Sequence, residues 1–171
     1  MANWCSNSVV FIGSEEKCEA IYRLFGDMEV NQALTGKYQL PEFAKDERGV
    51  MSDIVIHRRG VSFETRWVPN LKLLMEIADF YDTGFFSKFN EMQTGVLGEA
   101  RYEQGTLTLV SLDEEDYKAV RYDFTRQGYP LGERFFEEEG DLLDYILEQK
   151  KLNDAYIQVY HRDSGLENGR A

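Results

Sequence analysis

Residues 53–69 read DIVIHRRGVSFETRWVP and contain the pattern that decides the fold. The run 53–57 is rich in β-branched residues and predicts a strand, and the turn falls at 58–60, where Gly60 closes it. The following run alternates apolar and polar residues, which is typical of a half-buried strand. Its inward side chains are expected to be Val61, Phe63, Thr65 and Trp67.

The hairpin is flanked on each side by a predicted helix. Residues 7–13 predict a strand that ends at Gly13, and Ser14 is a suitable N-cap for a helix that we expect to stop at Gly26. After the hairpin, Pro69 is placed to begin a second helix, with Gly84 as its end. Three further strands are predicted at 86–91, 96–102 and 106–110.

The resulting order β-α-β-β-α-β predicts an α+β fold with a ferredoxin-like split βαβ antiparallel sheet and helices on one face. We expect this core to span residues 1–112, with residues 27–52 as an insertion. A C-terminal α/β extension, residues 113–163, is expected to pack on the core, with 164–171 as a flexible tail. A helix around residues 142–151 and a strand at 156–160 belong to that extension.

Two sequence blocks resemble a known family. The opening MANWCSN, residues 1–7, and the block FETRWVP, residues 63–69, are similar to the YubB-like family of small proteins from plasmids, phages and genomic islands. A looser third block begins with FNE at residues 89–91 and leads to Gly95 and Gly98, so the resemblance spans roughly residues 1–110. It implies a ferredoxin-like domain and a mobile-element context, but no reaction. The motif residues that it implies, with structural roles, are Trp4, Cys5, Asn7, Gly13, Phe63, Thr65, Trp67, Pro69, Glu91 and Gly98.

The sequence predicts no catalytic, metal or cofactor site. Its cysteines and histidines are Cys5, Cys18, His57 and His161, and none has the paired spacing of a structural zinc site. No glycine-flanked serine elbow and no glycine-rich phosphate loop with a lysine is present. Glu91 is the carboxylate of most interest, although a buried structural glutamate is the expected interpretation. Two reduced cysteines and no secretory signal favour a cytoplasmic location.

Charge limits the class of partner. The chain has 171 residues, 19 Lys+Arg against 31 Asp+Glu, and a formal net charge of −12. Such a surface argues against direct binding of nucleic acid, whose phosphates require clustered Lys and Arg, and against an anionic membrane surface. No apolar run reaches the roughly 20 residues that span a bilayer. Phe63 and Trp67 could form a base-stacking face beside Arg66, but we expect both rings in the core.

Most of the excess charge lies in one stretch. Residues 113–148 contain 12 acids and 4 bases, which is −8 of the total −12. We therefore expect a non-enzymatic protein that occupies a basic surface on a host or defence protein, with carboxylates imitating DNA phosphates. The alternatives are a small-molecule or nucleotide-handling enzyme with a pocket at the sheet and the 27–52 insertion, and a structural homo-oligomer. The expected partner-binding residues are Asp113, Glu114, Glu115, Asp116, Glu137, Glu138, Glu139 and Asp141.

Overall fold

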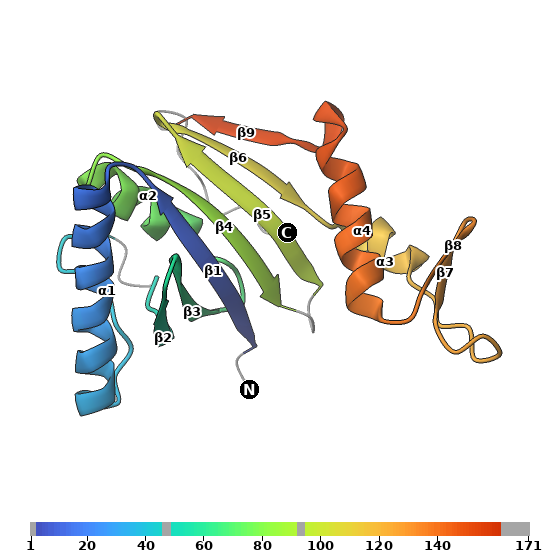
Figure 1. Cartoon of the computed structure of the whole chain (residues 1–171), viewed down its shortest axis with the longest axis horizontal. Coiled ribbons are helices and arrows are strands. Elements are labelled where there is room, and N and C mark those ends of the chain that lie inside the picture. Colours follow the sequence, from blue (N-terminus) through green and yellow to red (C-terminus); the bar gives the residue numbers. More distant parts are fainter. Residues whose placement is uncertain (1–2, 46–48, 92–94, 162–171) are drawn as a thin grey trace.

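The computed structural model describes residues 3–45, 49–91 and 95–161. The expected tail at 164–171 lies outside these residues. Figure 1 shows a twisted sheet with α1 on one side and the C-terminal α4 on the other. The elements are β1 (Trp4–Ile12), α1 (Glu15–Thr35), β2 (Ser52–His57), β3 (Gly60–Arg66), α2 (Leu71–Phe80), β4 (Gly84–Glu91), β5 (Val96–Glu103), β6 (Thr106–Ser111), α3 (Glu114–Ala119), β7 (Tyr129–Leu131), β8 (Arg134–Phe136), α4 (Glu139–Lys151), the 3₁₀ turn η1 (Asp154–Tyr156) and β9 (Gln158–His161).

The main sheet has the strand order β2-β3-β1-β4-β5-β6-β9, and every neighbouring pair is antiparallel. Its first four strands, with α1 and α2 as the two connections, form the split βαβ unit, which confirms the ferredoxin-like fold. Strands β5 and β6 continue the sheet as a meander. The last strand, β9, returns from the extension and pairs with β6.

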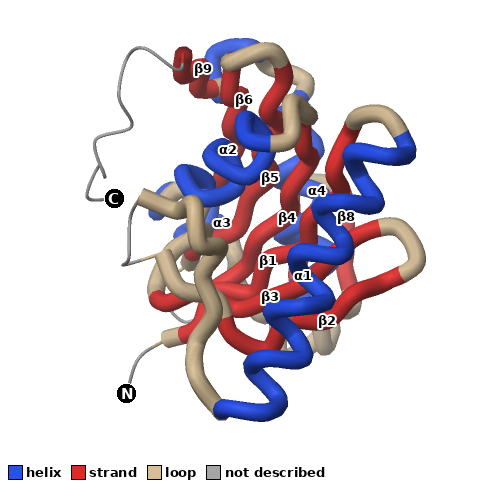
Figure 2. The backbone as a smooth tube through the Cα atoms, turned by 90° about the vertical axis from the view of Figure 1, so that its left-hand side faces the viewer, coloured by secondary structure: helices blue, strands red, loops and turns tan. Residues whose placement is uncertain are grey.

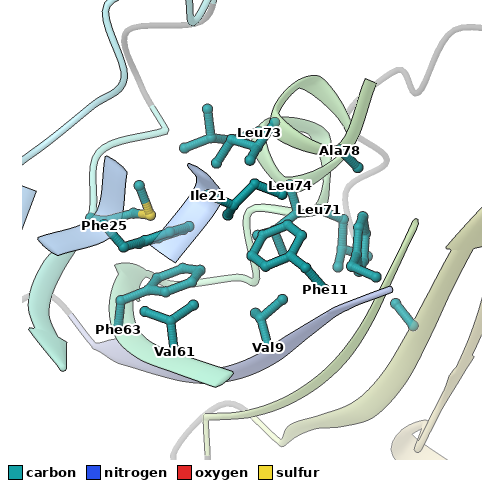
Figure 3. Packing of buried hydrophobic residues seen from close by; sticks show 14 of the residues in the cluster. Val9, Phe11, Ile21, Phe25, Val61, Phe63, Leu71, Leu73, Leu74 and Ala78 are labelled. Carbon is teal, nitrogen blue, oxygen red and sulfur yellow. The ribbon is translucent and has the colours of Figure 1, made fainter. Parts of the chain in front are cut away.

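One face of the sheet packs against α1 and α2. Figure 2 shows α1 lying across the strands on the side that faces the viewer. The main hydrophobic core lies between these helices and the sheet, and the rings of Phe25 from α1 and Phe63 from β3 stack there with centroids 6.0 Å apart. Figure 3 shows this contact beside Val9, Val61 and the leucines of α2. Burial of these side chains supplies the main force that holds the core together.

The opposite face is partly covered by the extension. Val110 of β6 lies opposite Glu99 of β5, and Glu99 lies opposite Lys88 of β4, so these side chains point away from α1 and α2. Val110 belongs to a second, smaller apolar cluster with Leu143 and Leu147 of α4. The two helices of the core unit therefore share one face, as expected, whereas the helix of the extension covers the other.

Three expectations about local structure were wrong. Helix α1 does not stop at Gly26 but continues to Thr35 and ends at Gly36, whose φ of 67° suits glycine. The irregular part of the predicted insertion is therefore shorter than 27–52. The second helix ends at Phe80, and Gly84 instead begins β4.

Trp67 also departs from its expected place. It follows the last residue of β3 with a φ of 69°, so the alternation of the strand ends before it. Its side chain is 49% exposed, whereas Phe63 is 1% exposed in the core. The two aromatic residues therefore do not share a face. The prediction that both rings lie in the core is correct for Phe63 and wrong for Trp67.

Candidate functional site

The two blocks of the family resemblance meet at the pairing of β1 with β3. Cys5 lies opposite Thr65, and Asn7 lies opposite Phe63. The buried Asn7 side chain donates from Nδ2 to the Cys5 carbonyl at 2.8 Å and to Thr65 Oγ1 at 2.9 Å. Thr65 Oγ1 in turn donates to the Val68 carbonyl at 2.8 Å. This network gives partners to the Asn7 amide nitrogen and the Thr65 hydroxyl and joins two adjacent strands, while Asn7 Oδ1 has no hydrogen-bond partner among the described residues.

Cys5 has the environment of a structural cysteine. Its side chain is fully buried, and that burial raises the pKa of the thiol to about 12. The nearby charge of Glu91 acts in the same direction. The thiol therefore stays protonated near neutral pH, whereas a nucleophilic cysteine needs a lowered pKa. The partly buried Cys18 thiol also has a raised pKa, because of its burial.

The remaining motif residues lie at packing or turn positions. Gly98 is opposite Phe89, and a Cβ at this glycine would lie 2.6 Å from the Phe89 ring. Glu91 is buried at the end of β4, and it lies outside both clefts described below. Gly13 precedes the N-cap Ser14, and Pro69 precedes the N-cap Asn70 of α2. Trp4 packs against Tyr38 at 5.8 Å, beneath the guanidinium of Arg66.

Two of the predicted partner-binding acids serve the fold. Asp113 caps α3 by accepting from the backbone N–H groups of Glu115 and Asp116, and the Asp116 carboxylate accepts from the Asp113 N–H in return. Lys150 of α4 then forms ion pairs with both Asp113, at 2.7 Å, and Asp116. These contacts join α3 to the C-terminal end of α4.

The electrostatics of Lys150 follow from this geometry. Lys150 is only 6% exposed, and burial alone lowers the pKa of an ammonium group. The hydrogen bonds and charges of Asp113 and Asp116 outweigh that effect, so the net pKa of Lys150 is raised. The same contact with Lys150 lowers the pKa of Asp113. We call this group, Lys150 with Asp113 and Asp116, the lysine clamp.

A second buried carboxylate fastens α4 to the sheet. Glu99 of β5 is nearly buried and forms ion pairs with Lys151 of α4 at 2.7 Å and with Lys88 of β4 at 2.8 Å. Burial raises the pKa of Glu99, but its hydrogen bonds and charge contacts with the two lysines produce a net lowering. The sequence did not predict this contact between Glu99 and the two lysines. For the lysine clamp a partial signal existed, since Lys150 follows Leu147 by three residues and falls on the apolar side of the helix.

The other predicted acids, apart from Glu139, are exposed. Glu114 and Glu115 pair with Lys118 at the surface of α3, at 3.1 Å and 2.8 Å. The side chains of Leu142, Leu143 and Leu147 define the buried side of α4. At 3.6 residues per turn, the opposite side of this helix carries a row of carboxylates. We call this row, with the two exposed acids before the helix, the α4 acidic face: Glu137, Glu138, Asp141, Asp144 and Glu148.

Glu139, also predicted to bind a partner, lies off that row. Its carboxylate accepts a hydrogen bond from the Tyr129 hydroxyl of β7 at 3.2 Å. Asp144 and Glu148 were not among the predicted residues, although Asp144 follows Asp141 by three residues and Glu148 follows Asp144 by four, a helical spacing that could have revealed them. Glu148 also pairs with Lys151 at 2.7 Å, so its charge is partly compensated.

Two clefts bear on the enzyme alternative. The larger, of about 840 Å³, lies between the end of α2 and the β5–β6 turn, and its polar lining includes Asp79, Asp82, Glu103 and His161. The smaller, of about 220 Å³, includes Phe43 and Lys45 of the segment predicted as an insertion. Neither contains Glu91 or His57. In the part of the chain that the structure describes, no group of His, Cys, Asp and Glu side chains could hold a metal ion.

On the face of the sheet away from α1 and α2, two cations of β4 and β5 are paired with carboxylates. Lys88 pairs with Glu99, and Arg101 pairs with Glu103 at 2.7 Å. These cations are therefore already compensated by neighbouring carboxylates, which does not favour binding of phosphates there. Among the described residues, no helix has the length and apolar composition needed to cross a membrane.

Comparison with known proteins supports the fold. Residues 51–132 match a family model described as "Ferredoxin-like domain in Api92-like protein". The match runs from the start of the β2–β3 hairpin to the end of β7, a little under half of the chain, and leaves β1 and α1 outside. It does not confirm the YubB-like family name. No curated protein and no solved structure matches the chain.

Proposed function

We propose that this chain is a non-enzymatic binding protein whose α4 acidic face occupies a basic surface on a partner protein. The observation that carries the proposal is the division of α4 into two sides. One side is apolar and packs on the sheet and α3, and the other presents Asp141, Asp144 and Glu148 to solvent. Aligned exposed charges of one sign steer an oppositely charged partner and raise its rate of association.

The spacing of these acids supports imitation of a nucleic acid. With a rise of about 1.5 Å per residue, Asp141 and Asp144 are about 4.5 Å apart along the axis, and Asp144 and Glu148 about 6 Å. Phosphates of one DNA strand follow each other at about 3.4 Å along the duplex axis. The carboxylates of α4 thus form a line of anions that is sparser than the phosphates of one DNA strand but has spacings of the same order. A DNA-binding defence protein or another nucleic-acid-handling protein of the host is the class of partner that this line fits.

The cellular setting belongs to the same proposal. The blocks at residues 1–7 and 63–69 are similar to YubB-like proteins of plasmids, phages and genomic islands. The family match at 51–132 supports a ferredoxin-like domain in this chain. A mobile element that carries such a protein would use it in the cytoplasm against a host defence system. The buried Cys5 thiol is free, which suits a reducing compartment.

The experiment compares two variants that each lose two Asp and two Glu charges. Asp113 and Asp116 are left intact because they hold the lysine clamp. The acidic-face variant contains Glu137→Gln, Glu138→Gln, Asp141→Asn and Asp144→Asn. The control variant contains Asp27→Asn, Glu29→Gln, Glu42→Gln and Asp53→Asn, at positions in α1, the following segment and β2.

Each variant and the unmodified chain are used to capture proteins from a lysate of the host cell. We expect a basic protein that the unmodified chain and the control variant retain and the acidic-face variant loses. High salt should release it because exposed charge contacts are screened, and duplex DNA should displace it if the acids imitate phosphates. Equal retention by both variants would contradict the proposal, and failure of DNA to compete would contradict the mimicry.

A second candidate function is supported by the larger cleft alone. Its volume of about 840 Å³ lies in the range of small-molecule sites, and its lining includes three carboxylates, of which Glu103 pairs with Arg101 and Asp82 with Lys17, so a polycation would compete with these pairs. Spermidine is a suitable probe. Calorimetric titration would measure its binding to the unmodified chain and to Glu103→Gln. Heat of binding that Glu103→Gln reduces would support the cleft as a site. The homo-oligomer alternative is tested by light scattering over a range of protein concentrations.

A further inference from the structure

A short turn in the extension displays an aromatic side chain at its tip. Asp123 and Gly128 form an isolated antiparallel bridge, with Asp123 N donating to the Gly128 carbonyl at 2.7 Å. Between them lies Phe124, whose side chain is 86% exposed. We call residues 122–128 the aromatic turn. Phe124 is the most exposed large hydrophobic residue among the described residues, and because single exposed hydrophobics are common, its role depends on the structure around it.

The aromatic turn is fixed by its own hydrogen bonds. Asp123 Oδ1 accepts from the backbone N–H of Thr125 at 2.9 Å and of Arg126 at 3.1 Å, an arrangement that stabilises a tight turn. Gln127 closes the turn with a φ of 56°. Because these contacts order the backbone before any partner arrives, binding through Phe124 would carry a reduced entropic cost.

Neighbouring aromatic rings connect the tip to α4. The Tyr122 ring meets Phe124 edge-on at 5.0 Å and Tyr129 of β7 at 5.2 Å. Tyr129 in turn donates its hydroxyl hydrogen to Glu139, in the first turn of α4. Figure 1 shows the β7–β8 hairpin projecting from the molecule next to α4. The exposed ring therefore lies on a folded arm joined to the first turn of α4.

We propose that Phe124, supported by Tyr122, is an apolar anchor that enters a pocket on the basic surface of the partner. The inference rests on the proposed function and adds what that partner must carry, which is an apolar pocket bordered by Arg or Lys. Protein interfaces commonly place buried aromatic anchors inside a polar and charged rim. Here the anchor is connected through Tyr122 and Tyr129 to Glu139 in the first turn of α4, the helix that carries the acids. A second copy of this chain is a poorer occupant, because its own charge of −12 would repel the first.

The probes are two short peptides of equal length and charge, one alternating arginine with leucine and the other arginine with serine. Fluorescence anisotropy measures their binding to the full chain at low and at high salt. We expect the unmodified chain to bind the arginine–leucine peptide at least about fivefold more tightly, since a truncated anchor commonly costs that much or more. Phe124→Ser should remove this preference and leave binding of the arginine–serine peptide unchanged.

Two controls make the result specific to the aromatic turn. Phe80→Ser removes another exposed phenylalanine, on α2, and should keep the preference for leucine. Asp123→Asn and Asp123→Ala lose the same charge, but only asparagine retains an oxygen that can accept the two turn hydrogen bonds. We expect the preference to persist in Asp123→Asn and to fall in Asp123→Ala, because the anchor is then no longer preordered.

Several outcomes would overturn the anchor. These are the absence of a leucine preference in the unmodified chain, equal effects of Phe124→Ser and Phe80→Ser, or a dimer in light scattering that Phe124→Ser abolishes. Failure of the proposed function looks different. In that case the acidic-face variant would bind both peptides as tightly as the control variant does. The failure of the anchor and the failure of the proposed function can therefore be distinguished.

Discussion

The core unit and the C-terminal extension are stabilised in different ways. Among the described residues, twenty buried side chains form the cluster between the sheet and α1 and α2, whereas four form the cluster beneath α4. The extension compensates with ion pairs that involve nearly buried groups, in the lysine clamp and at Glu99. The contrast shows that the acids of this chain are of two kinds, one that attaches α4 and one that faces solvent.

Removing a core ring is expected to have the largest effect. Phe63→Ala should lower the free energy of unfolding by about 3–5 kcal/mol, because it leaves a cavity between β3 and α1. Trp4 and Trp67 lie at the ends of β1 and β3, so their fluorescence during denaturation follows this unit. The control is Phe124→Ala, which removes a ring that is almost fully exposed and should change stability by less than about 0.5 kcal/mol. Similar losses in both variants would contradict the distinction between core and extension.

Breaking the lysine clamp should have a smaller and more local effect. Lys150→Met keeps most of the side-chain volume but leaves Asp113 and Asp116 without their cation. Loss of one partner of a buried pair costs about 3–5 kcal/mol, and we expect about 2 kcal/mol here because Asp113 is 58% exposed. Hydrogen exchange should show that the α4 amides lose protection. The midpoint of the unfolding transition followed by tryptophan fluorescence should shift less than it does in Phe63→Ala.

Lys118→Met is the matched control for the clamp. Lys118 also pairs with two acids of α3, but all three side chains are more than half exposed. Exposed pairs contribute little, so this change should cost less than about 0.5 kcal/mol. If Lys118→Met loosened α4 as much as Lys150→Met does, the clamp would not depend on burial.

Acid should release the extension before the core. The pKa values of Asp113 and Glu99 are both lowered in the folded chain, so each stabilises the fold above its ordinary pKa of about 4. That contribution is lost as the pH falls through the lowered values. The raised pKa of Lys150 matters at alkaline pH. Its contribution to the stability of the fold is complete below about pH 10.4 and is lost as the pH rises through the raised value. Hydrogen exchange at decreasing pH should therefore show α4 opening first, and simultaneous loss of β1 and α4 would contradict this.

The sequence predicted the sheet well because its signals are local. Alternation of apolar and polar residues placed β3, and the order of strands and helices gave the split βαβ unit that the family match supports. The exposed position of Trp67 was not predicted, because the alternation ends at a residue with a positive φ. The pattern of residue types does not reveal such a backbone conformation. Helix α3 was missed for a related reason. It has six residues and no buried side chain, so it leaves no apolar period.

The candidate site was predicted less completely. The count of acids located the extension, but it could not separate Asp113 and Asp116, which the clamp uses, from Asp141, which faces solvent. That separation depends on where Lys150 lies in three dimensions, more than thirty residues away along the chain. The exposed position of Phe124 likewise depends on the closed turn between Asp123 and Gly128. Charge composition therefore led to the hypothesis of a basic partner, and tertiary structure was needed to separate the acids that hold α4 from those that face solvent.

The smallest expected effects are on stability, and they have opposite signs at two glycines of α1, one inside the helix and one at its C-terminal end. Gly26 lies inside α1, where a Cβ would meet Ile56 Cδ1 at 3.4 Å, an ordinary contact. Gly26→Ala should therefore stabilise the core by about 0.5–1 kcal/mol, since alanine favours the helix. Gly36→Ala should instead destabilise it by about 1 kcal/mol because of its φ of 67°, although nothing lies near that position. Thermal unfolding measures both, and a loss of stability in Gly26→Ala would mean that the contact between α1 and β2 is too close for a methyl group.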